Sequence, residues 1–322
     1  MVDEHFEQPA SSLRFTLRQV ECFLAVAEAG SIAKAAILLS ASDSTVADAI
    51  SAMERSLGAK LFQRRRSHGA TLTSDGRTVL PLARRILADG AELTAAVGRD
   101  AGAVVGPVRI GCSPTLASLI LPQLIVEVGH RFPGIELEYH TDDLAPMIAK
   151  IENSELDLVV SFDIDVPPEF ENVQLSTTRA MLVVASDHRL ADRESASLSE
   201  VADEDMVLLD ILSSRTHTLE LMSARGVTPR IKYRTPDYEL CRSLVGRNLG
   251  YTLLMRRQVS RDTWDGKQVV YLPIDPAPRA VGVQMSWKLE TIPPRVRAVV
   301  DCAQSISADL VGAMDKGDES SL

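Results

Sequence analysis

A run of three arginines, Arg64–Arg66, is the strongest local signal for binding through charge. Guanidinium groups form paired hydrogen bonds with phosphate oxygens, and several of them together neutralise a polyanion. Alone, such a run is most often solvated surface. Here residues 14–86 hold eleven Lys and Arg against six Asp and Glu, whereas the rest of the chain holds 23 against 38. This asymmetry predicts a part that faces nucleic acid, joined to a body that does not.

Three short helices are predicted to position these basic side chains. Apolar residues at helical spacing predict the first over 16–29, and an Ala-rich segment predicts the second over 32–39. Ser42 can cap a third helix, whose apolar residues recur at helical spacing until Gly58 ends it. Three short helices with tight connections are typical of a helix-turn-helix unit.

A two-stranded element is predicted directly after the third helix. Apolar Leu61 and Phe62 precede the arginines, a turn is expected at His68 and Gly69, and β-prone residues follow at 71–73. This order predicts a wing whose strand or tip carries the three arginines. Next to a three-helix unit, arginines in this place favour contact with phosphate groups over a merely solvated surface.

The segment LRQVECFLAVAEAGSIAKAAILLSAS, followed by AISAMERSLGAKLFQRRRSHGATLTSDGR, resembles the N-terminal winged helix-turn-helix of LysR-type transcriptional regulators. The matching pieces stand in the family's order from residue 17 to residue 77. They are Phe23, Gly30-Ser31, Ala35-Ala36, Leu39, Ser42, Val46, Ile50, MERSLG at 53–58, Leu61, Phe62, Arg64, and Leu72-Thr73 before Gly76. The resemblance implies a homodimer or homotetramer that binds double-stranded DNA at an interrupted dyad, with RNA polymerase as a further partner.

The residues expected to contact DNA divide by chemistry. Cationic side chains are expected to bind phosphate groups, and polar side chains on the outward row of the third helix are expected to select bases. The expected residues are Lys34, Ser44, Thr45, Asp48, Arg55, Lys60, Arg64, Arg65 and Arg66.

Two aspartates in the third helix depart from the resembling family's pattern. That family usually has Gln where this chain has Asp43, Ser where it has Ala47, and often Arg where it has Asp48. Asp43 suits the positive N-terminal end of the helix. Asp48 falls on the outward row, where a carboxylate repels phosphates but can accept a hydrogen bond from the N4 amino group of cytosine. We therefore predict that Asp48 restricts which bases are accepted.

A long helical pattern with an apolar stripe runs from Ser74 to about Arg99. Pro81 is expected to bend this helix or to mark a restart. In the resembling family the corresponding helix pairs with its twin in a dimer. Packing of the same stripe onto its own chain stays open as the alternative. We place a DNA-binding domain at 14–73 and a linker and dimerisation helix at 74–100.

Beyond a small-residue boundary at 101–107, predicted strands and helices alternate as far as residue 310. Their order indicates βαβ units, a mostly parallel sheet and two α/β lobes. The expected effector-binding domain is 106–310, with one lobe at about 106–165 and 270–310, the other at about 166–269, and crossings near 165–168 and 268.

This body resembles the effector-binding half of LysR-type regulators, which is shaped like a periplasmic binding protein. The segments that carry the resemblance are GPVRIGCSPTLASLILPQLIVEV, LDLVVSF, VASDHRLA and LVGRNLGYTLLM. The expected fold is an α+β multidomain chain with an N-terminal winged helix-turn-helix, a long linker helix and a two-lobed α/β domain.

A ligand site is predicted where the body's strands end and its helices begin. In open parallel sheets, ligands lie beyond the carboxyl ends of strands, where helix N-termini offer N–H donors. The resemblance implies a small-molecule effector there, and we expect a small organic acid or another metabolite. Helix capping or turn formation is the competing explanation for each polar residue. The expected residues are Ser113, Pro114, Thr115, Phe162, Asp163, Asp210, Ser213, Ser214 and Tyr238.

Other function classes have less support in the sequence. The cysteines, Cys22, Cys112, Cys241 and Cys302, form no CxxC pair or Cys/His cluster, so we expect buried reduced thiols without a metal site or a cofactor. A thiol redox switch through Cys112 or Cys241 stays an alternative. So does a regulator with weakened DNA binding that acts through a partner protein. An enzyme is not expected, because GxGxxG, P-loop and GxSxG motifs are absent.

The N-terminus and the apolar runs of the chain predict its location. The opening MVDEHFEQPASSLR is polar and acidic, whereas a signal peptide needs a positive start and an apolar stretch. No apolar run approaches the roughly 20 residues of a membrane span. We therefore expect a cytoplasmic protein without a membrane partner.

Overall fold

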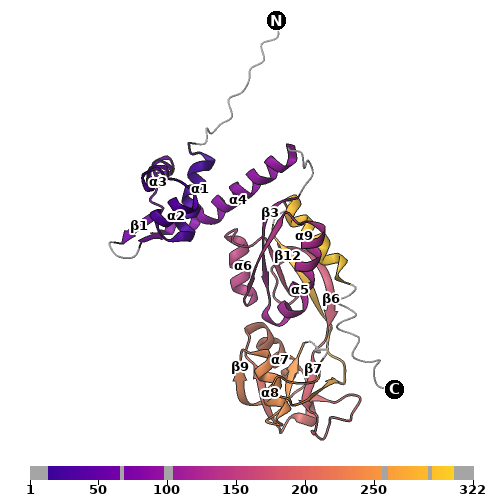
Figure 1. The fold of residues 1–322 in the computed structure, drawn as a ribbon. Coiled ribbons are helices and arrows are strands. Elements are labelled where there is room, and N and C mark those ends of the chain that lie inside the picture. Colours follow the sequence, from indigo (N-terminus) through magenta and orange to yellow (C-terminus); the bar gives the residue numbers. More distant parts are fainter. Residues whose placement is uncertain (1–13, 66–68, 98–103, 256–259, 289–291, 308–322) are drawn as a thin grey trace. The chain divides into compact units, whose positions relative to one another are not determined.

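The computed structural model describes residues 14–65, 69–97, 104–255, 260–288 and 292–307 (Figure 1). The chain divides into two compact units, with the division between Gly106 and Pro107 apart from a three-residue exception at 153–155. The described helices include none that is long and apolar enough to cross a membrane.

The N-terminal unit contains three helices packed around one apolar core. α1 (Leu17–Ala29) begins at Thr16, which forms a capping box with Gln19. α2 (Ile32–Leu38) and α3 (Asp43–Leu57) follow, so the expected order of helices is confirmed. The buried residues of this core include Val20, Phe23, Ala35, Val46, Ile50 and Met53.

The wing consists of two antiparallel strands, β1 (Phe62–Arg65) and β2 (Gly69–Leu72). The backbone N–H of Ala70 donates to the carbonyl oxygen of Gly30 at the end of α1, at 2.8 Å. Gly69 lies so close that a Cβ on it would stand 2.2 Å from the same oxygen, and its φ is 75°. Only glycine fits this position, and the wing is thereby fixed against α1.

The linker helix α4 (Ser74–Val97) runs without interruption through Pro81, so the expected restart is wrong. A proline inside a helix removes one backbone hydrogen bond, a loss that packing elsewhere in the helix outweighs here. The first half of α4 packs on the three-helix core, whereas Leu82 and Leu93 are 51% and 71% exposed. Part of the apolar stripe of α4 is therefore buried against its own chain, and part is exposed. The residues of α4 in that core are Val79, Leu80, Ala83 and Leu87.

The first lobe of the second unit is a sheet covered by helices. Its elements are β3 (Gly106–Cys112), α5 (Pro114–Arg131), β4 (Ile135–Thr141), α6 (Leu144–Glu152), β5 (Leu158–Phe162), β6 (Glu171–Thr178), β12 (Val281–Trp287) and α9 (Pro294–Ser305). The strand order is β4-β3-β5-β12-β6. Helices α5 and α9 pack on each other, and α6 packs on β5 on the other side of the sheet (Figure 1).

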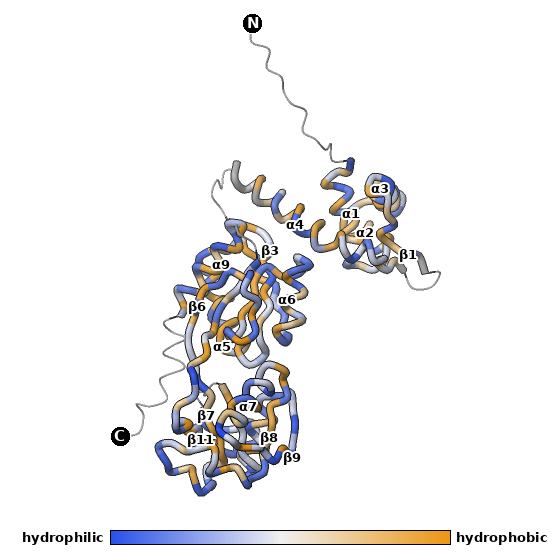
Figure 2. The backbone as a smooth tube through the Cα atoms, turned by 180° about the vertical axis from the view of Figure 1, so that it is seen from behind, coloured by the Kyte–Doolittle hydropathy of each residue, from blue (hydrophilic) through white to orange (hydrophobic). Residues whose placement is uncertain are grey.

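The second lobe contains two smaller sheets, β10-β7-β11 and β8-β9. Its elements are β7 (Met181–Ala185), a 3-10 turn (Leu198–Val201), β8 (Asp205–Leu209), α7 (Leu212–Ala224), β9 (Arg230–Thr235), α8 (Tyr238–Gly246), β10 (Thr252–Leu254) and β11 (Val269–Pro273). Figure 2 shows hydrophobic stretches in its strands β7, β8 and β11. Their buried side chains, together with Cys241 and Val245 of α8, form the core of this lobe.

Two expectations about the body are corrected by the strand pairing. The expected mostly parallel sheet is wrong: the five-stranded sheet is mixed, because β12 runs antiparallel to both β5 and β6 while β3 runs parallel to β5. The sheet β10-β7-β11 is antiparallel, and only β8-β9 is purely parallel. The chain also leaves the first lobe after Thr178, not near 165–168, and returns after Pro273, not near 268. The polar strand β6 carries little hydrophobic pattern, which is why the sequence did not predict it.

Candidate DNA-binding and effector-binding sites

Helix α3 buries one face and exposes the other. The buried residues are Val46, Ile50 and Met53. The exposed residues include Ser44, Thr45, Asp48 and Arg55. Leu57, the last apolar residue at this helical spacing, was expected to be buried with them, but it lies in the last turn and is 39% exposed. A polar row at helical spacing is therefore open for contact along most of α3.

The first turn of α3 is held by its cap. The Ser42 hydroxyl accepts a hydrogen bond from the backbone N–H of Thr45 at 3.1 Å and lies 2.8 Å from the hydroxyls of both Ser44 and Thr45. Asp43 is exposed in this turn, at the positive end of the helix, where a carboxylate stabilises. Ser44 and Thr45 are thereby presented in a fixed arrangement.

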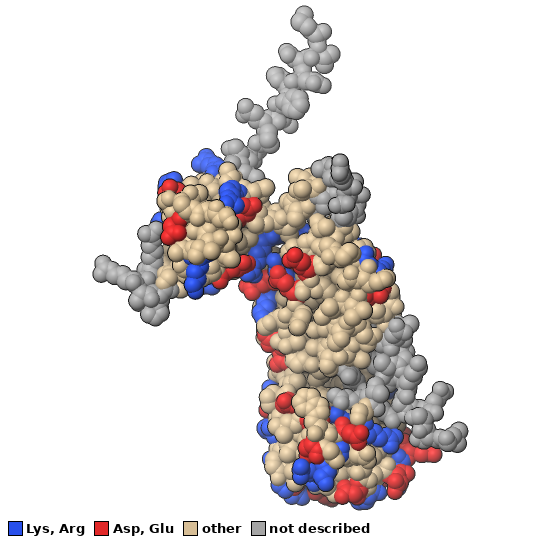
Figure 3. Space-filling model, viewed as in Figure 1, with Lys and Arg blue, Asp and Glu red and all other residues tan. Residues whose placement is uncertain are grey.

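The expected phosphate-binding cations occupy different elements. Lys34 is exposed on α2 and Arg55 is exposed on α3. The Lys60 ammonium group lies 2.6 Å from the Glu54 carboxylate, so its charge is already paired within the unit. Figure 3 shows Lys and Arg interspersed with Asp and Glu on the visible face of this unit. On that face, the cations are separate contact points and not a continuous patch.

Two of the three arginines expected in the wing belong to the described part of the chain. Arg64 and Arg65 belong to strand β1, of which the backbone is described. Arg66 lies outside the described residues, as does His68 of the expected turn, whereas Gly69 is the first residue of β2.

Glu54 is a buried carboxylate that joins α3 to the wing, a role that the sequence did not reveal. Its side chain accepts hydrogen bonds from the backbone N–H groups of Leu61 at 2.9 Å and Phe62 at 3.4 Å, and from the Lys60 ammonium group. Burial by itself raises the pKa of Glu54, but these hydrogen bonds outweigh it and hold the pKa below its ordinary value. Glu54 therefore stabilises the wing in its ionised form.

Replacing Glu54 by alanine is expected to loosen the wing, because it leaves the buried N–H of Leu61 without a partner, at a cost of about 1–3 kcal/mol. Hydrogen exchange of the full chain, followed by mass spectrometry, should show roughly 5- to 150-fold faster exchange in peptides from this unit. Glu21→Ala is the control, since its pair with Arg18 is exposed and contributes little. Equal exchange in both variants would refute the role of Glu54.

The lowered pKa of Glu54 gives this stabilisation a pH dependence. It is complete above the ordinary glutamate pKa of about 4.3 and is lost as the pH falls through the lower value of the folded state.

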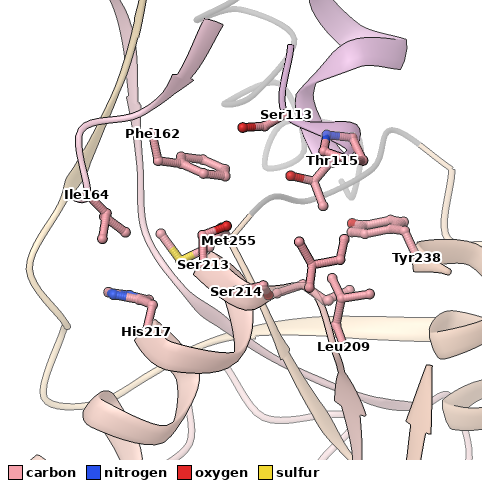
Figure 4. Close-up of a pocket in the computed structure, with 13 residues that line it drawn as sticks. Ser113, Thr115, Phe162, Ile164, Leu209, Ser213, Ser214, His217, Tyr238 and Met255 are labelled. Atoms are coloured by element: carbon pink, nitrogen blue, oxygen red, sulfur yellow. The ribbon is translucent and has the colours of Figure 1, made fainter. Parts of the chain in front are cut away.

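Seven of the nine residues expected to bind an effector line one pocket, formed by both lobes of the second unit (Figure 4). They are Ser113, Pro114 and Thr115 at the start of α5, Phe162 at the end of β5, Ser213 and Ser214 in the first turn of α7, and Tyr238 at the start of α8. The cavity volume is about 20 Å³, which is room for about one water molecule.

Two helix starts give this pocket its electrostatic character. The residues that precede α5 and α7, Ser113 and Ile211, make no side-chain capping bond. In contrast, Asp237 caps α8 through the backbone N–H of Leu240 at 2.8 Å. At the start of α5 the N–H of Leu116 donates to the Ser113 carbonyl oxygen at 2.9 Å, and at the start of α7 the N–H of Leu212 donates to the Asp143 carboxylate at 3.4 Å. What both starts turn toward the pocket is the positive end of the helix dipole. Because the described lining includes no Lys or Arg, these starts are its main features that suit an anion.

Asp163 and Asp210 were expected in the pocket but do not line it. Asp163 is exposed, and its backbone N–H donates to the carbonyl oxygen of Gly282 at 2.9 Å. The Asp210 carboxylate forms an ion pair with Arg215 and approaches Arg234 at 4.0 Å. Both aspartates follow strand ends, as expected, but the interactions given above are formed with residues of their own lobes and not with the pocket.

Six residues that line the pocket were not predicted from the sequence. Five of them are apolar and carry no chemical signal: Ile164, Leu209, Ile211, Leu254 and Met255. The sixth, His217, lies four residues after Ser213 and shares its face of α7, so the helical spacing could have revealed it. Among the described residues, no group of three or more His, Cys, Asp or Glu could hold a metal ion.

Two models of known protein families match the chain, one in each unit. A model described as "Bacterial regulatory helix-turn-helix protein, lysR family" matches residues 17–77, and one described as "LysR substrate binding domain" matches residues 101–307. The second match covers more than half of the chain. The chain belongs to the LysR family. This is a family of transcriptional regulators and not of enzymes.

Individual LysR family members are similar over most of their length. The transcriptional regulator ShiR of Corynebacterium glutamicum is 33% identical over 241 residues, which are 74% of this chain and 81% of ShiR. The dual regulator OxyR of Escherichia coli is 27% identical over 295 residues, 88% of this chain and 96% of OxyR. The crystal structure of HinK, a LysR family regulator from Pseudomonas aeruginosa, is 28% identical with a TM-score of 0.62, covering 92% of this chain and all of HinK.

Several LysR relatives of this chain are named hydrogen peroxide-inducible genes activators, so the reactivity of its cysteines is of interest. In this chain Cys22, Cys112, Cys241 and Cys302 are free and buried. Burial raises the pKa of Cys112 to about 12 and that of Cys241 to about 11. Reactive cysteines have a lowered pKa and access to solvent, so these thiols have the character of packing residues.

Proposed function

We propose that this LysR family member binds an interrupted dyad upstream of its target gene. Its mode of DNA binding changes when a small organic acid binds in the pocket. The observation that carries the proposal is the pocket itself, where residues far apart in the sequence meet at the starts of α5, α7 and α8. The exposed row on α3 supports the DNA-binding part. Once bound near a promoter, the protein would act on RNA polymerase.

Assembly into a homodimer or homotetramer is supported by exposed apolar side chains. Leu82 and Leu93 of α4 are 51% and 71% exposed, and Val126 of α5 is 72% exposed. Figure 3 shows a broad uncharged area on the lobe that carries α5. Apolar surface of this kind is typical of contact surfaces between proteins. A two-fold assembly selects two-fold DNA sites, which explains the proposed dyad.

The response to an effector is proposed to act through closure of the lobes. The pocket has room for about one water molecule, so the lobes must separate before an organic acid fits between them. An acid that binds one degree of closure better than another shifts the population toward it. In the assembly, that shift would alter the spacing of the DNA-binding units.

Footprinting on the DNA upstream of the protein's own gene tests this proposal. At a stated salt concentration, we expect protection of two half-sites related by a dyad, and a changed footprint when a panel of small organic acids is added. Protection no stronger than on random DNA would overturn it. That outcome would favour the second reading, a regulator with weakened DNA binding that acts through a partner protein, for which the exposed Asp48 is the supporting observation.

A thiol redox switch is the remaining candidate, supported by similarity to OxyR but not by the burial of the thiols. We expect hydrogen peroxide to leave DNA affinity unchanged within about twofold, because a buried thiol with a raised pKa forms little thiolate. Anisotropy titrations before and after peroxide treatment measure this. A peroxide effect that disappears in Cys112→Ser with Cys241→Ser would establish the switch.

A further inference from the structure

The DNA-binding unit contains a pocket of its own, between α3 and the wing. Its volume is about 240 Å³. An engineered cavity of about 150 Å³ is enough to bind benzene, so this pocket has room for one aromatic side chain. The ring of Phe62 lines it, and aromatic rings attract one another edge to face. Its apolar lining residues are Val26, Ile32, Ala47, Ile50, Phe62 and Ala70.

The chain enters this unit on the opposite side of α3 from the pocket. The Ser56 hydroxyl donates a hydrogen bond to the carbonyl oxygen of Arg14, the first described residue, at 2.6 Å. Ala47 of the pocket and Ser56 are about two and a half helical turns apart, so they lie on opposite sides of α3. The core of the unit fills one way around the helix, and the exposed row with Asp48 and Arg55 lies on the other. A segment that joins Arg14 to the pocket must therefore cross this row.

The segment before Arg14, residues 1–13, is long enough to make this crossing. Phe6 is the only Phe, Tyr or Trp in it. An extended chain spans about 3.3 Å per residue, so the stretch from Phe6 to Arg14 reaches roughly 26 Å. A helix with its side chains is about 10–12 Å across, so half of its circumference is about 16–19 Å. The ring of Phe6 can therefore reach the pocket over the outside of α3.

Charge attracts the same segment to this face of the unit. Residues 1–13 hold three acidic residues and no Lys or Arg, whereas residues 14–86 hold eleven basic residues against six acidic ones. Arg55 is exposed in the row that the segment would cross, and Lys60 lines the pocket with a side chain that is 78% exposed. Asp48, in the same row, opposes this attraction. The charges thus supply a general attraction, and the aromatic ring must fix the position.

We propose that, in the absence of DNA, residues 1–13 lie across the exposed row of α3 with the ring of Phe6 in the pocket beside the wing. The segment then competes with DNA for this face, so the inference rests on the proposed DNA binding by α3. A segment tethered next to its site has an effective concentration of about a millimolar, so weak contacts suffice to dock it. If about nine-tenths of the molecules are docked, the apparent affinity for DNA is about tenfold below that of the open form.

Removal of the ring in the full chain tests the competition. Phe6→Ser leaves the net charge unchanged, and Val2→Ser is the matched control, because it replaces another apolar residue of the same segment. In anisotropy titrations with the upstream DNA, we expect Phe6→Ser to bind about tenfold more tightly than the original protein. Val2→Ser should stay within about twofold of it. An equal affinity of Phe6→Ser and the original protein, or an equal gain in both variants, would overturn the competition.

A photo-crosslink locates the ring without any use of DNA binding. The full chain with p-azidophenylalanine in place of Phe6 is irradiated, and crosslinked peptides of the single-chain product are identified by mass spectrometry. We expect crosslinks to the peptides of α3, β1 and β2 that line the pocket, and their loss when excess upstream DNA is added. Crosslinks elsewhere, crosslinks only between two chains, or none at all would overturn the docking.

The two experiments separate this inference from the proposed function. If neither the original protein nor Phe6→Ser prefers the upstream DNA over a shuffled fragment while the crosslinks to the pocket persist, the proposed function falls and the docking stands. If the original protein prefers the upstream DNA but Phe6→Ser binds it no more tightly, the proposed function stands and the competition falls.

Discussion

Reversing the charges of Lys34 and Arg55 together, as Lys34→Glu with Arg55→Glu, is expected to lower affinity for the operator by at least about 100-fold. Both side chains are exposed, on α2 and α3, and neither is placed in an ion pair with a described residue. Each replacement removes a phosphate contact and adds a repulsive charge. The loss should be uniform across DNA sequences, and the slope of log affinity against log salt should fall by about two.

The matched control carries the same charge reversals on the second unit, as Arg261→Glu with Lys267→Glu. Both of these side chains are exposed, and the net charge of the protein changes by the same amount. Anisotropy titrations at several salt concentrations compare the two double variants, and circular dichroism checks that both are folded. If the control loses as much affinity as the test variant, overall charge and not the face of α2 and α3 governs binding.

Asp48→Ala is expected to relax base selection at one position of each half-site, by about 1–3 kcal/mol or roughly 5- to 150-fold. Asp48 is exposed on the same face of α3 as Ser44 and Arg55, where its carboxylate can accept a hydrogen bond from cytosine. Affinity for non-operator DNA should rise at the same time, because a charge that repels phosphates is removed. Titration of operators with each base pair replaced in turn measures the selectivity.

Asp43→Ala is the control for Asp48, since it removes an equal charge from the same helix. Asp43 lies in the first turn, so its loss should cost about 0.3–1 kcal/mol of stability and leave base preference unchanged. If Asp48→Ala tightens binding equally on every DNA sequence tested, Asp48 is only a repulsive charge and has no part in selection.

Local signals explain why the winged helix-turn-helix was predictable. The cap at Ser42 and the left-handed Gly58 fix the ends of α3 within a few residues of chain. The second lobe depends on longer-range pairing. Strand β6 is recognisable only by its partner β12, which lies about a hundred residues further on. No local pattern in a polar strand predicts such a partner, so the crossing between lobes was misplaced.

The pocket was predictable where its chemistry lies at helix starts. Ser113 and Ser213 follow strand ends, a place that the topology of α/β sheets makes a binding site. Asp210 follows a strand end as well, but its pairing with Arg215 depends on side-chain geometry that the sequence does not show. His217 could have been predicted from its helical spacing to Ser213, whereas the burial of its Nε2 atom without a partner is visible only in the folded structure.

Affinity for the upstream DNA, compared with a shuffled fragment of the same base composition, tests the central claim most directly. Anisotropy titration of the full chain at about 0.15 M salt should give at least about 1,000-fold tighter binding to the upstream fragment. That preference should shrink when Lys34 and Arg55 are reversed. Equal affinity for the two fragments would contradict sequence-specific DNA binding by α3 and the wing.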